Sequence, residues 1–257
     1  MRKKISRLDI FQVDAGTRPL IGDILSNATL PRVLILHGAG NANRGYFRLF
    51  REQLLIHGIS SAAFDFVGHG DTGGELKSSS LLSRTRQACS VADSLNIQQP
   101  LSVIGASMGA YTAVKLLEYY QIESLILIVP AMYIAAAYTI PFNEGFTDII
   151  RQPESWRHSD AWNLLSGYRG RLLIIAAEND KIIPKGVINK IYDSAVNAKE
   201  RKLFVAPRTS HTVLTDLRSN NPEGFCSVLG QIVEMLKNYE SGKPFIDRLG
   251  RCQYGGS

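Results

Sequence analysis

Cysteine is scarce in this chain of 257 residues: there are three, and Cys89, Cys226 and Cys252 lie far apart. Such a set predicts neither a disulfide framework nor a cysteine-based zinc site, and it is typical of a reducing compartment. No run of about 18 apolar residues occurs, so we expect no transmembrane helix. The basic start is interrupted by charged and polar residues before the apolar core of a signal peptide can form. We therefore expect a cytoplasmic protein.

The charge is moderately one-sided, because 29 basic residues against 23 acidic ones give a net charge of +6. A basic chain can bind nucleic acid or an anionic membrane. Apart from the short run at residues 2–4, however, the basic residues are scattered, and no aromatic and basic nucleic-acid module accompanies them. We expect a solvated basic surface, no nucleic-acid partner and no stable membrane insertion. The oligomeric state stays open between a monomer and a homodimer.

Short apolar runs alternate with stretches of helical periodicity along most of the chain. They predict strands at residues 7–13, 19–26, 32–36, 59–66, 101–105, 124–129, 171–177 and 202–206. They predict helices at residues 46–57, 80–95, 108–120, 185–196 and 222–239. This alternation indicates a single α/β domain whose mostly parallel, twisted eight-stranded sheet carries helices on both faces. The first two strands are joined by a polar turn, so we expect them to form an antiparallel edge.

Two segments fall outside this rhythm. Residues 131–170 separate two predicted strands by far more chain than an ordinary connection, and we predict a small cap over the strand ends. As a group its aromatic residues favour an apolar substrate pocket, although each one singly is better explained by packing. The candidate substrate-binding residues among them are Tyr133, Tyr138, Phe142, Trp156 and Trp162. Residues 242–257 show no clear period, and we predict a loosely attached tail.

Polar residues follow several predicted strands at their carboxyl ends, where parallel sheets bind ligands. Ser107 follows the strand at residues 101–105, Asp180 follows residues 171–177, and His211 follows residues 202–206. Because the carboxyl ends of parallel strands meet at one edge, we expect these three side chains to lie together.

The stretch GASMG at residues 105–109 has the G-x-S-x-G pattern of a nucleophile elbow, a sharp strand-to-helix turn that exposes a serine hydroxyl. Alone, the pattern often marks only a glycine-rich turn. A neutral serine needs an adjacent base, and a histidine base needs an acceptor that holds its tautomer. We predict Ser107 as nucleophile, His211 as base and Asp180 as acid. Glu178 is the alternative acid, and Asp180 is preferred because it lies further past the strand.

Acyl transfer also needs two backbone N–H donors for the oxyanion that forms on the carbonyl oxygen. We predict one at Met108, directly after the serine. The other is predicted at Ala39, in the HGAG loop that follows the strand at residues 32–36. His37 of this loop is a candidate substrate-binding residue and equally fits a role in shaping the loop. This chemistry requires no metal and no organic cofactor, and we expect none.

Four motifs at these positions resemble the α/β-hydrolase superfamily. They are LHGAG at residues 36–40, FDFVGHGDTGG at 64–74, IGASMGA at 104–110, and AENDKIIP at 177–184 followed by the histidine loop. The chain is similar to small serine esterases such as cinnamoyl and feruloyl esterases and monoacylglycerol-lipase-like proteins. The resemblance implies the α/β-hydrolase fold and assigns the same roles to Ser107, Asp180, His211, Ala39 and Met108.

The resemblance also implies a function. We expect hydrolysis of carboxylic esters with small to medium apolar acyl or aryl groups, through a Ser-His-Asp triad and an acyl-enzyme intermediate. The small-molecule ester is the expected partner. The sequence leaves three alternatives open: a thioesterase, a peptidase-like amidase that uses the same triad, and a non-catalytic ligand-binding module of the same fold.

Overall fold

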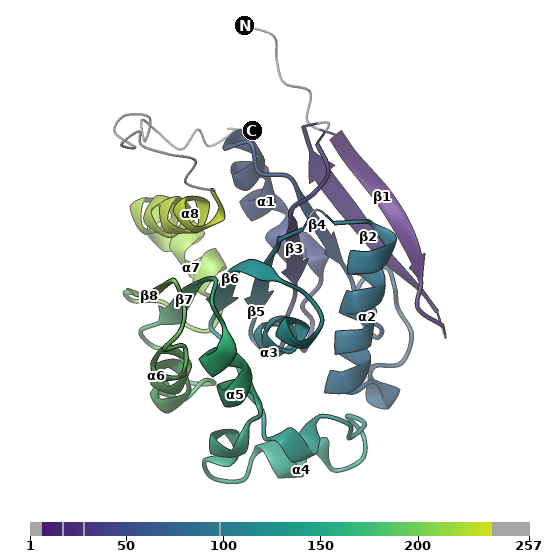
Figure 1. The fold of residues 1–257 in the computed structure, drawn as a ribbon, viewed down its shortest axis with the longest axis vertical. Helices are drawn as coiled ribbons and strands as arrows, with labels where there is room; N and C mark the ends of the chain where they lie inside the picture. Colours follow the sequence, from purple (N-terminus) through teal and green to yellow (C-terminus); the bar gives the residue numbers. More distant parts are fainter. Residues whose placement is uncertain (1–6, 17, 28, 98, 238–257) are drawn as a thin grey trace, which may run out of the picture.

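The computed structural model describes residues 7–16, 18–27, 29–97 and 99–237, and its strands form one eight-stranded sheet in the order β1-β2-β4-β3-β5-β6-β7-β8 (Figure 1). The strands are β1 (Arg7–Asp14), β2 (Pro19–Ser26), β3 (Val33–Leu36), β4 (Ser61–Phe64), β5 (Leu101–Ala106), β6 (Ile122–Ile128), β7 (Arg171–Ala177) and β8 (Glu200–Ala206). β2 pairs antiparallel with β1 and with β4, and the remaining neighbours are parallel. The predicted mostly parallel sheet and its antiparallel edge are confirmed.

The predicted helices are present, with ends shifted by a few residues. The helices are α1 (Arg48–Ile56), α2 (Leu81–Ser94), α3 (Met108–Lys115), α4 (Phe146–Ile150), α5 (Ala161–Gly167), α6 (Lys185–Ser194), α7 (Val213–Asn220) and α8 (Pro222–Leu236). Short 3-10 turns are η1 (Arg44–Phe47), η2 (Leu76–Ser78), η3 (Leu116–Glu118), η4 (Ala135–Ala137) and η5 (Ser155–His158). Sequence patterns did not predict α7, which begins two residues after His211.

Local sequence explains where two of the long helices start. The Ser80 hydroxyl accepts from the backbone N–H of Ser83, and the Ser83 hydroxyl accepts from that of Ser80, which is a reciprocal cap on α2. At α8, the Asn221 side chain accepts from the N–H of Gly224, and Pro222 occupies the first turn.

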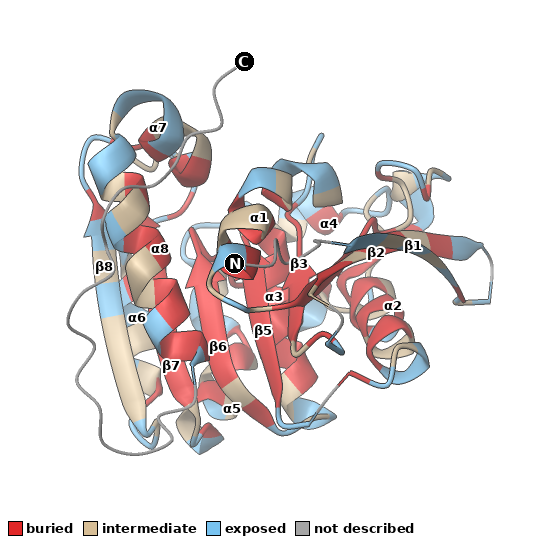
Figure 2. Ribbon diagram, turned by 90° about the horizontal axis from the view of Figure 1, so that it is seen from above, coloured by how far each residue is buried: buried red, intermediate tan, exposed pale blue. Residues whose placement is uncertain are grey.

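Side chains of the central strands alternate between two hydrophobic clusters, one on each face of the sheet. In β3, Leu34 and Leu36 join the first cluster, which includes residues of α2, α3, α5 and α6. Val33 and Ile35 join the second cluster, with residues of α1, α7 and α8. Figure 2 shows the central strands buried and the edge strands β1 and β8 partly exposed. Burial on both faces explains why these strands are continuous apolar runs.

The segment between β6 and β7 carries η4, α4, η5 and α5 and projects at one end of the molecule (Figure 1). It is tied to α3 through the carboxylate of Asp160, which accepts from the Tyr111 hydroxyl at 2.7 Å and from Lys115 Nζ at 2.9 Å. Lys115 also lies over the ring of Tyr138, 4.5 Å from its centroid. The role of this segment as a cap stays a prediction.

Two expectations concern features outside the sheet. Of the cysteines in the described residues, Cys89 is free and Cys226 is disulfide-bonded, whereas the sequence predicted no disulfide framework. The cysteine count therefore no longer supports a reducing compartment, and the cytoplasmic location stays a prediction. No described helix combines the length and hydropathy needed to cross a membrane. The predicted tail at residues 242–257 lies outside the described residues.

Candidate active site

Ser107 lies in the turn between β5 and α3, and the turn is strained. Its backbone has φ of 51° and ψ of −119°, a conformation that residues with side chains rarely adopt. The strand and helix can meet this closely because Gly105 and Gly109 carry no side chain. A Cβ on Gly105 would overlap the Gly109 carbonyl oxygen, and one on Gly109 would overlap that of Leu36. Both glycines of the G-x-S-x-G motif are thus required for packing, and the turn presents the serine.

The structure brings Ser107, His211 and Asp180 into one hydrogen-bonded chain. Nε2 of His211 lies 3.0 Å from the Oγ of Ser107, and its Nδ1 lies 2.9 Å from Oδ2 of Asp180. Because an ionised carboxylate only accepts, Nδ1 carries the proton and Nε2 is left to accept from the serine hydroxyl. The side chain of Asp180 is 7% exposed and that of His211 is 21% exposed, so the acid is shielded while the base stays accessible.

Asp180 is held by its own loop. Its Oδ1 accepts from the backbone N–H groups of Ile182 at 2.8 Å and Ile183 at 3.0 Å, which leaves Oδ2 for the histidine. Glu178, the alternative acid, is used differently, because its Oε2 accepts from the N–H of Arg208 at 2.7 Å. The geometry therefore favours Asp180 and gives Glu178 a part in holding the loop after β8.

Asp216 of α7 holds the loop that carries His211. Its Oδ2 accepts from the backbone N–H of Ser210 at 2.6 Å and from the Ser210 hydroxyl at 2.7 Å. Its Oδ1 accepts from the Thr212 hydroxyl at 3.0 Å. Sequence patterns missed this residue. The signal that could have found it is an acid in the first turn of a helix, but α7 was not predicted.

We expect Asp216→Ala to lower kcat by about tenfold with little change in KM, because a histidine displaced by a fraction of an ångström is a poorer base. Burial raises the pKa of Asp216, but the hydrogen bonds from Ser210 and Thr212 outweigh it and hold this pKa below its ordinary value. At pH values above the pKa that Asp216 has in the unfolded state, its carboxylate is ionised and holds the loop. This stabilisation is lost as the pH falls through the lower pKa that Asp216 has in the folded state.

The measurement is kcat as a function of pH for Asp216→Ala, with Glu223→Ala as the control. Glu223 is an exposed acid in the first turn of α8, away from the histidine loop. Asp216→Asn removes the charge and keeps one acceptor oxygen, so it should fall between the wild type and Asp216→Ala. Equal kcat values in the two alanine variants would show that Asp216 does not position His211.

The two predicted oxyanion donors lie beside Ser107. Met108 begins α3, and the partial positive charge of a helix N-terminus favours an anion there. The loop of Ala39 packs on Ser107, because a Cβ on Gly38 would lie 3.1 Å from the Cβ of Ser107. Among the described residues, no protein group accepts from the N–H of Ala39 or of Met108. Both groups are therefore free for a ligand oxygen.

His37 is part of the framework of this loop. It is 1% exposed, and the N–H of Phe66 donates to its Nε2 at 3.1 Å. Its Nδ1 therefore carries the proton and donates to the carbonyl oxygen of Gly38 at 2.8 Å. Burial, and after it the charge of Arg84 and the neighbouring His69, holds the pKa of His37 well below its ordinary value, so the ring is neutral. The structure thus places His37 in loop shaping and corrects its assignment to substrate binding.

A cavity of about 340 Å³ opens at Ser107 and is mainly apolar. It lies between the loop after β3 and the start of α7, on the side of the second hydrophobic cluster. Its lining contains no aspartate, glutamate, lysine or arginine. The lining residues are Gly38, Ala39, Asn41, Ala42, Tyr46, Phe47, Ala106, Ser107, Ile128, Val129, His211, Thr212, Val213 and Leu214.

The aromatic residues of the segment between β6 and β7 do not line this cavity. They pack beside the first hydrophobic cluster, on the other face of the sheet. Phe142 packs edge to face on Phe146, and Trp156 packs edge to face on Trp162. The Trp162 ring nitrogen also donates to the carbonyl oxygen of Trp156. The cavity at Ser107 is therefore not lined by Tyr133, Tyr138, Phe142, Trp156 or Trp162, and their role in substrate binding stays a prediction.

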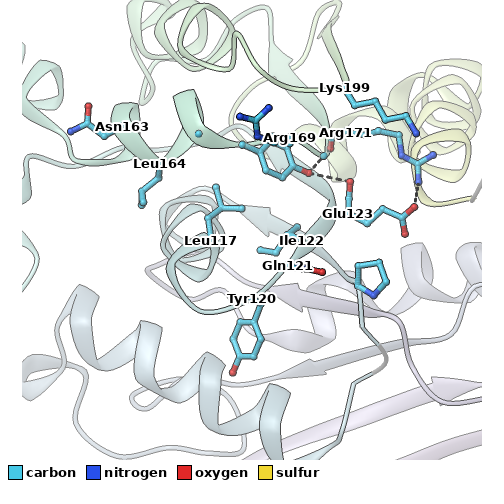
Figure 3. A pocket seen from close by; sticks show the side chains of 14 residues that line it. Leu117, Tyr120, Gln121, Ile122, Glu123, Asn163, Leu164, Arg169, Arg171 and Lys199 are labelled. Carbon is cyan, nitrogen blue, oxygen red and sulfur yellow. Dashed lines mark hydrogen bonds and ion pairs between the residues drawn. The ribbon is translucent and has the colours of Figure 1, made fainter.

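A larger cavity, of about 650 Å³, lies at the amino ends of β6 and β7 (Figure 3). Its floor is formed by apolar side chains such as Leu117 and Ile122, and its charged residues include Arg171, which pairs with Glu123 at 3.2 Å. None of the three residues of the Ser107 chain lines it. Because parallel sheets bind ligands at the carboxyl ends of their strands, the cavity at Ser107 is the candidate active site.

Comparison with known proteins agrees with this fold. A hydrolase family profile, described as serine aminopeptidase, S33, matches residues 28–158, half of the chain. Among curated protein sequences, none matches the chain.

Solved structures are similar along most of their length. An esterase from Pyrococcus furiosus is 21% identical, with 90% of this chain and 91% of that chain covered and a TM-score of 0.69. Est1E from Butyrivibrio proteoclasticus, solved with ferulic acid bound, is 18% identical, with 86% and 99% covered and a TM-score of 0.65. A 2-hydroxy-6-oxo-6-phenylhexa-2,4-dienoate hydrolase from Rhodococcus is 16% identical, with 90% and 99% covered and a TM-score of 0.64. The chain therefore has the α/β-hydrolase fold and belongs to the S33 serine aminopeptidase family of hydrolases.

Proposed function

We propose that this hydrolase is a serine esterase in which Ser107, His211 and Asp180 form the catalytic triad. The observation that carries the proposal is the chain of hydrogen bonds from Asp180 through His211 to Ser107, beside two free backbone N–H groups. A serine hydroxyl becomes a useful nucleophile when a positioned base removes its proton, and this geometry supplies the base.

In the first step, the Oγ of Ser107 attacks the ester carbonyl carbon while its proton passes to Nε2 of His211. The carbonyl oxygen becomes an oxyanion that accepts from the N–H groups of Ala39 and Met108. Asp180 stabilises the imidazolium through Nδ1. The ester bond then breaks, and the leaving alcohol takes the proton from Nε2, which leaves an acyl group on Ser107.

In the second step, water attacks the acyl carbon and gives its proton to His211. The second oxyanion uses the same two N–H groups. It collapses when the bond to the serine Oγ breaks, and His211 returns the proton to that oxygen. The acid is released, and the free enzyme is restored.

The cavity favours a neutral, apolar substrate. Val213, Leu214, Phe47 and Ile128 supply an apolar wall, and its volume of about 340 Å³ suits a small to medium acyl or aryl group. An aminopeptidase must bind the free α-ammonium group of its substrate, which a carboxylate would do best, and the lining contains none. An ester is therefore favoured over an aminoacyl amide, while thioesters of the same acyl groups fit the same site.

The test is hydrolysis of p-nitrophenyl esters from acetate to palmitate, of one matched acyl thioester, and of aminoacyl p-nitroanilides. We expect the largest kcat/KM for an ester of short to medium chain. We expect aminoacyl anilides to be cleaved at least about 100-fold more slowly, because their ammonium group would be buried without a partner. Faster cleavage of the anilides would contradict the ester assignment and favour an aminopeptidase.

A further inference from the structure

Arg84 of α2 lies directly behind the loop that carries Ala39. Its side chain is fully buried, at 0% exposure. Nη2 donates to the carbonyl oxygen of His37 at 2.6 Å and to that of Gly38 at 3.1 Å. The guanidinium lies over the ring of Phe66, with Cζ 3.7 Å from the ring centroid. Arg84 therefore reaches from the helix layer to the backbone next to the nucleophile.

Among the described residues no carboxylate pairs with Arg84, and the groups that favour its charge are the two carbonyl oxygens, the Phe66 ring and the Tyr133 hydroxyl. Its Nε has no hydrogen-bond partner there either. Burial lowers the pKa of Arg84 to about 9, so the side chain is still cationic at neutral pH. Burying an unpaired charge is costly. Simple packing is therefore a poor account of this residue, whose hydrogen bonds go to the two loop carbonyl oxygens and, at 3.4 Å, to Nε2 of His69.

Those contacts orient one particular peptide group. The carbonyl oxygen of Gly38 and the N–H of Ala39 belong to the same planar trans peptide, so they point in opposite directions. The Gly38 oxygen accepts from Arg84 and from Nδ1 of His37. With its oxygen held toward Arg84, the peptide directs the Ala39 N–H to the other side. Ala39 and Ser107 together line the cavity.

A cation at the oxygen end also polarises the peptide group. It draws electron density toward the carbonyl oxygen and leaves the Ala39 N–H a stronger donor, an effect that is larger in a site of low dielectric constant. Without Arg84, only the hydrogen bond from His37 would keep this peptide from turning its oxygen toward Ser107. In that orientation it would repel the oxyanion.

We propose that Arg84 is a positioning residue for the oxyanion hole, which acts on the substrate only through the peptide between Gly38 and Ala39. The inference rests on the proposed function, because it assigns the Ala39 N–H to the transition state of acyl transfer. Its effect is therefore expected in kcat and not in KM.

The experiment compares Arg84→Met and Arg84→Lys with a matched control, Arg51→Met. Arg51 of α1 is likewise buried, at 1% exposure, but it bonds to Asp23 and Ser61, away from Ser107. For each folded variant we would measure kcat, KM and inhibition by an aryl trifluoromethyl ketone, whose adduct with serine carries an oxyanion. Thermal unfolding gives the folded fraction.

Arg84→Met is expected to lower kcat by about 10- to 100-fold and to weaken inhibition by the ketone by a similar factor, with KM near the wild-type value. Arg84→Lys retains the charge but loses the forked arrangement of donors, so its kcat should lie between those of the wild type and Arg84→Met. Arg51→Met should keep the wild-type kcat per folded molecule. A folded Arg84→Met with wild-type kcat and ketone affinity would overturn the proposal. If Arg84→Met does not fold, unchanged kcat and ketone affinity in Arg84→Lys would overturn it.

One further readout separates this inference from the proposed function. The ¹H–¹⁵N resonance of Ala39 reports on its peptide group whether or not an ester is cleaved. We expect it to move further in Arg84→Lys than in Arg51→Met. If the wild type cleaved no ester, the esterase proposal would be wrong. If the Ala39 resonance did not shift in Arg84→Lys, the positioning role of Arg84 would be wrong.

Discussion

Replacing Ser107 with alanine is expected to lower kcat for the best ester by roughly 10,000-fold or more, since loss of a triad nucleophile leaves only the oxyanion hole and substrate binding. The folded state should persist, because within the described part of the chain the Ser107 hydroxyl hydrogen-bonds only to His211. The measurement is steady-state hydrolysis together with labelling by an alkyl fluorophosphonate. The wild type should bind one equivalent of probe and Ser107→Ala none.

Ser90→Ala is the matched control, because its hydroxyl donates only to the carbonyl oxygen of Arg86 within α2, on an exposed face. This variant should retain wild-type turnover and labelling. If Ser107→Ala kept more than about one hundredth of the wild-type kcat, another group would be the nucleophile, and the mechanism would have to be rebuilt. If the wild type were labelled but cleaved no ester, the nucleophile would stand and the substrate class would be wrong.

Asp180→Asn is expected to lower kcat by about 1,000- to 10,000-fold, the second largest loss. An asparagine amide placed as the carboxylate is now can donate to Nδ1 of His211. The proton of the neutral ring then moves to Nε2, which can no longer accept from Ser107. KM should change little, because Asp180 is not among the residues that line the cavity at Ser107.

Glu178→Gln is the natural control for this variant. The glutamine oxygen can still accept from the N–H of Arg208, which is the bond that Glu178 makes in the structure. We expect a loss in kcat of less than about tenfold, measured with the same ester. A larger loss in Glu178→Gln than in Asp180→Asn would show that the acid of the triad had been assigned to the wrong residue.

The strands, and the residues Ser107, Asp180 and His211, could be predicted from the sequence because each depends on a local pattern. A strand buried on both faces must be a continuous apolar run, as in β7. The turn at Ser107 requires small residues on either side, and the sequence has them as Gly105 and Gly109. The carboxyl ends of parallel strands share one edge, so the chain order of Ser107, Asp180 and His211 was enough to bring them together.

The lining of the cavity at Ser107 could not be predicted from local patterns. An aromatic residue fits packing and substrate binding equally, and the face of the sheet on which it lies depends on how its segment returns to the next strand. In the structure Trp156 and Trp162 pack beside the first hydrophobic cluster, while Val213 and Leu214 of the unpredicted helix α7 line the cavity on the other side.

The supporting residues were hidden for a related reason. In the sequence, Arg84 is one basic residue among many on a helix of ordinary composition, and nothing nearby distinguishes it. Its partner Gly38 lies 46 positions away, just as His211 lies 104 positions from Ser107. His211 could be predicted because it follows a strand at its carboxyl end. The contacts of Arg84 form only when α2 packs against the loop after β3. Periodicity and turn chemistry act over a few residues, so the sequence determined the sheet and the placing of Ser107, Asp180 and His211 at one edge. The orientation of the peptide between Gly38 and Ala39 and the shape of the cavity depend on contacts that exist only in the packed molecule.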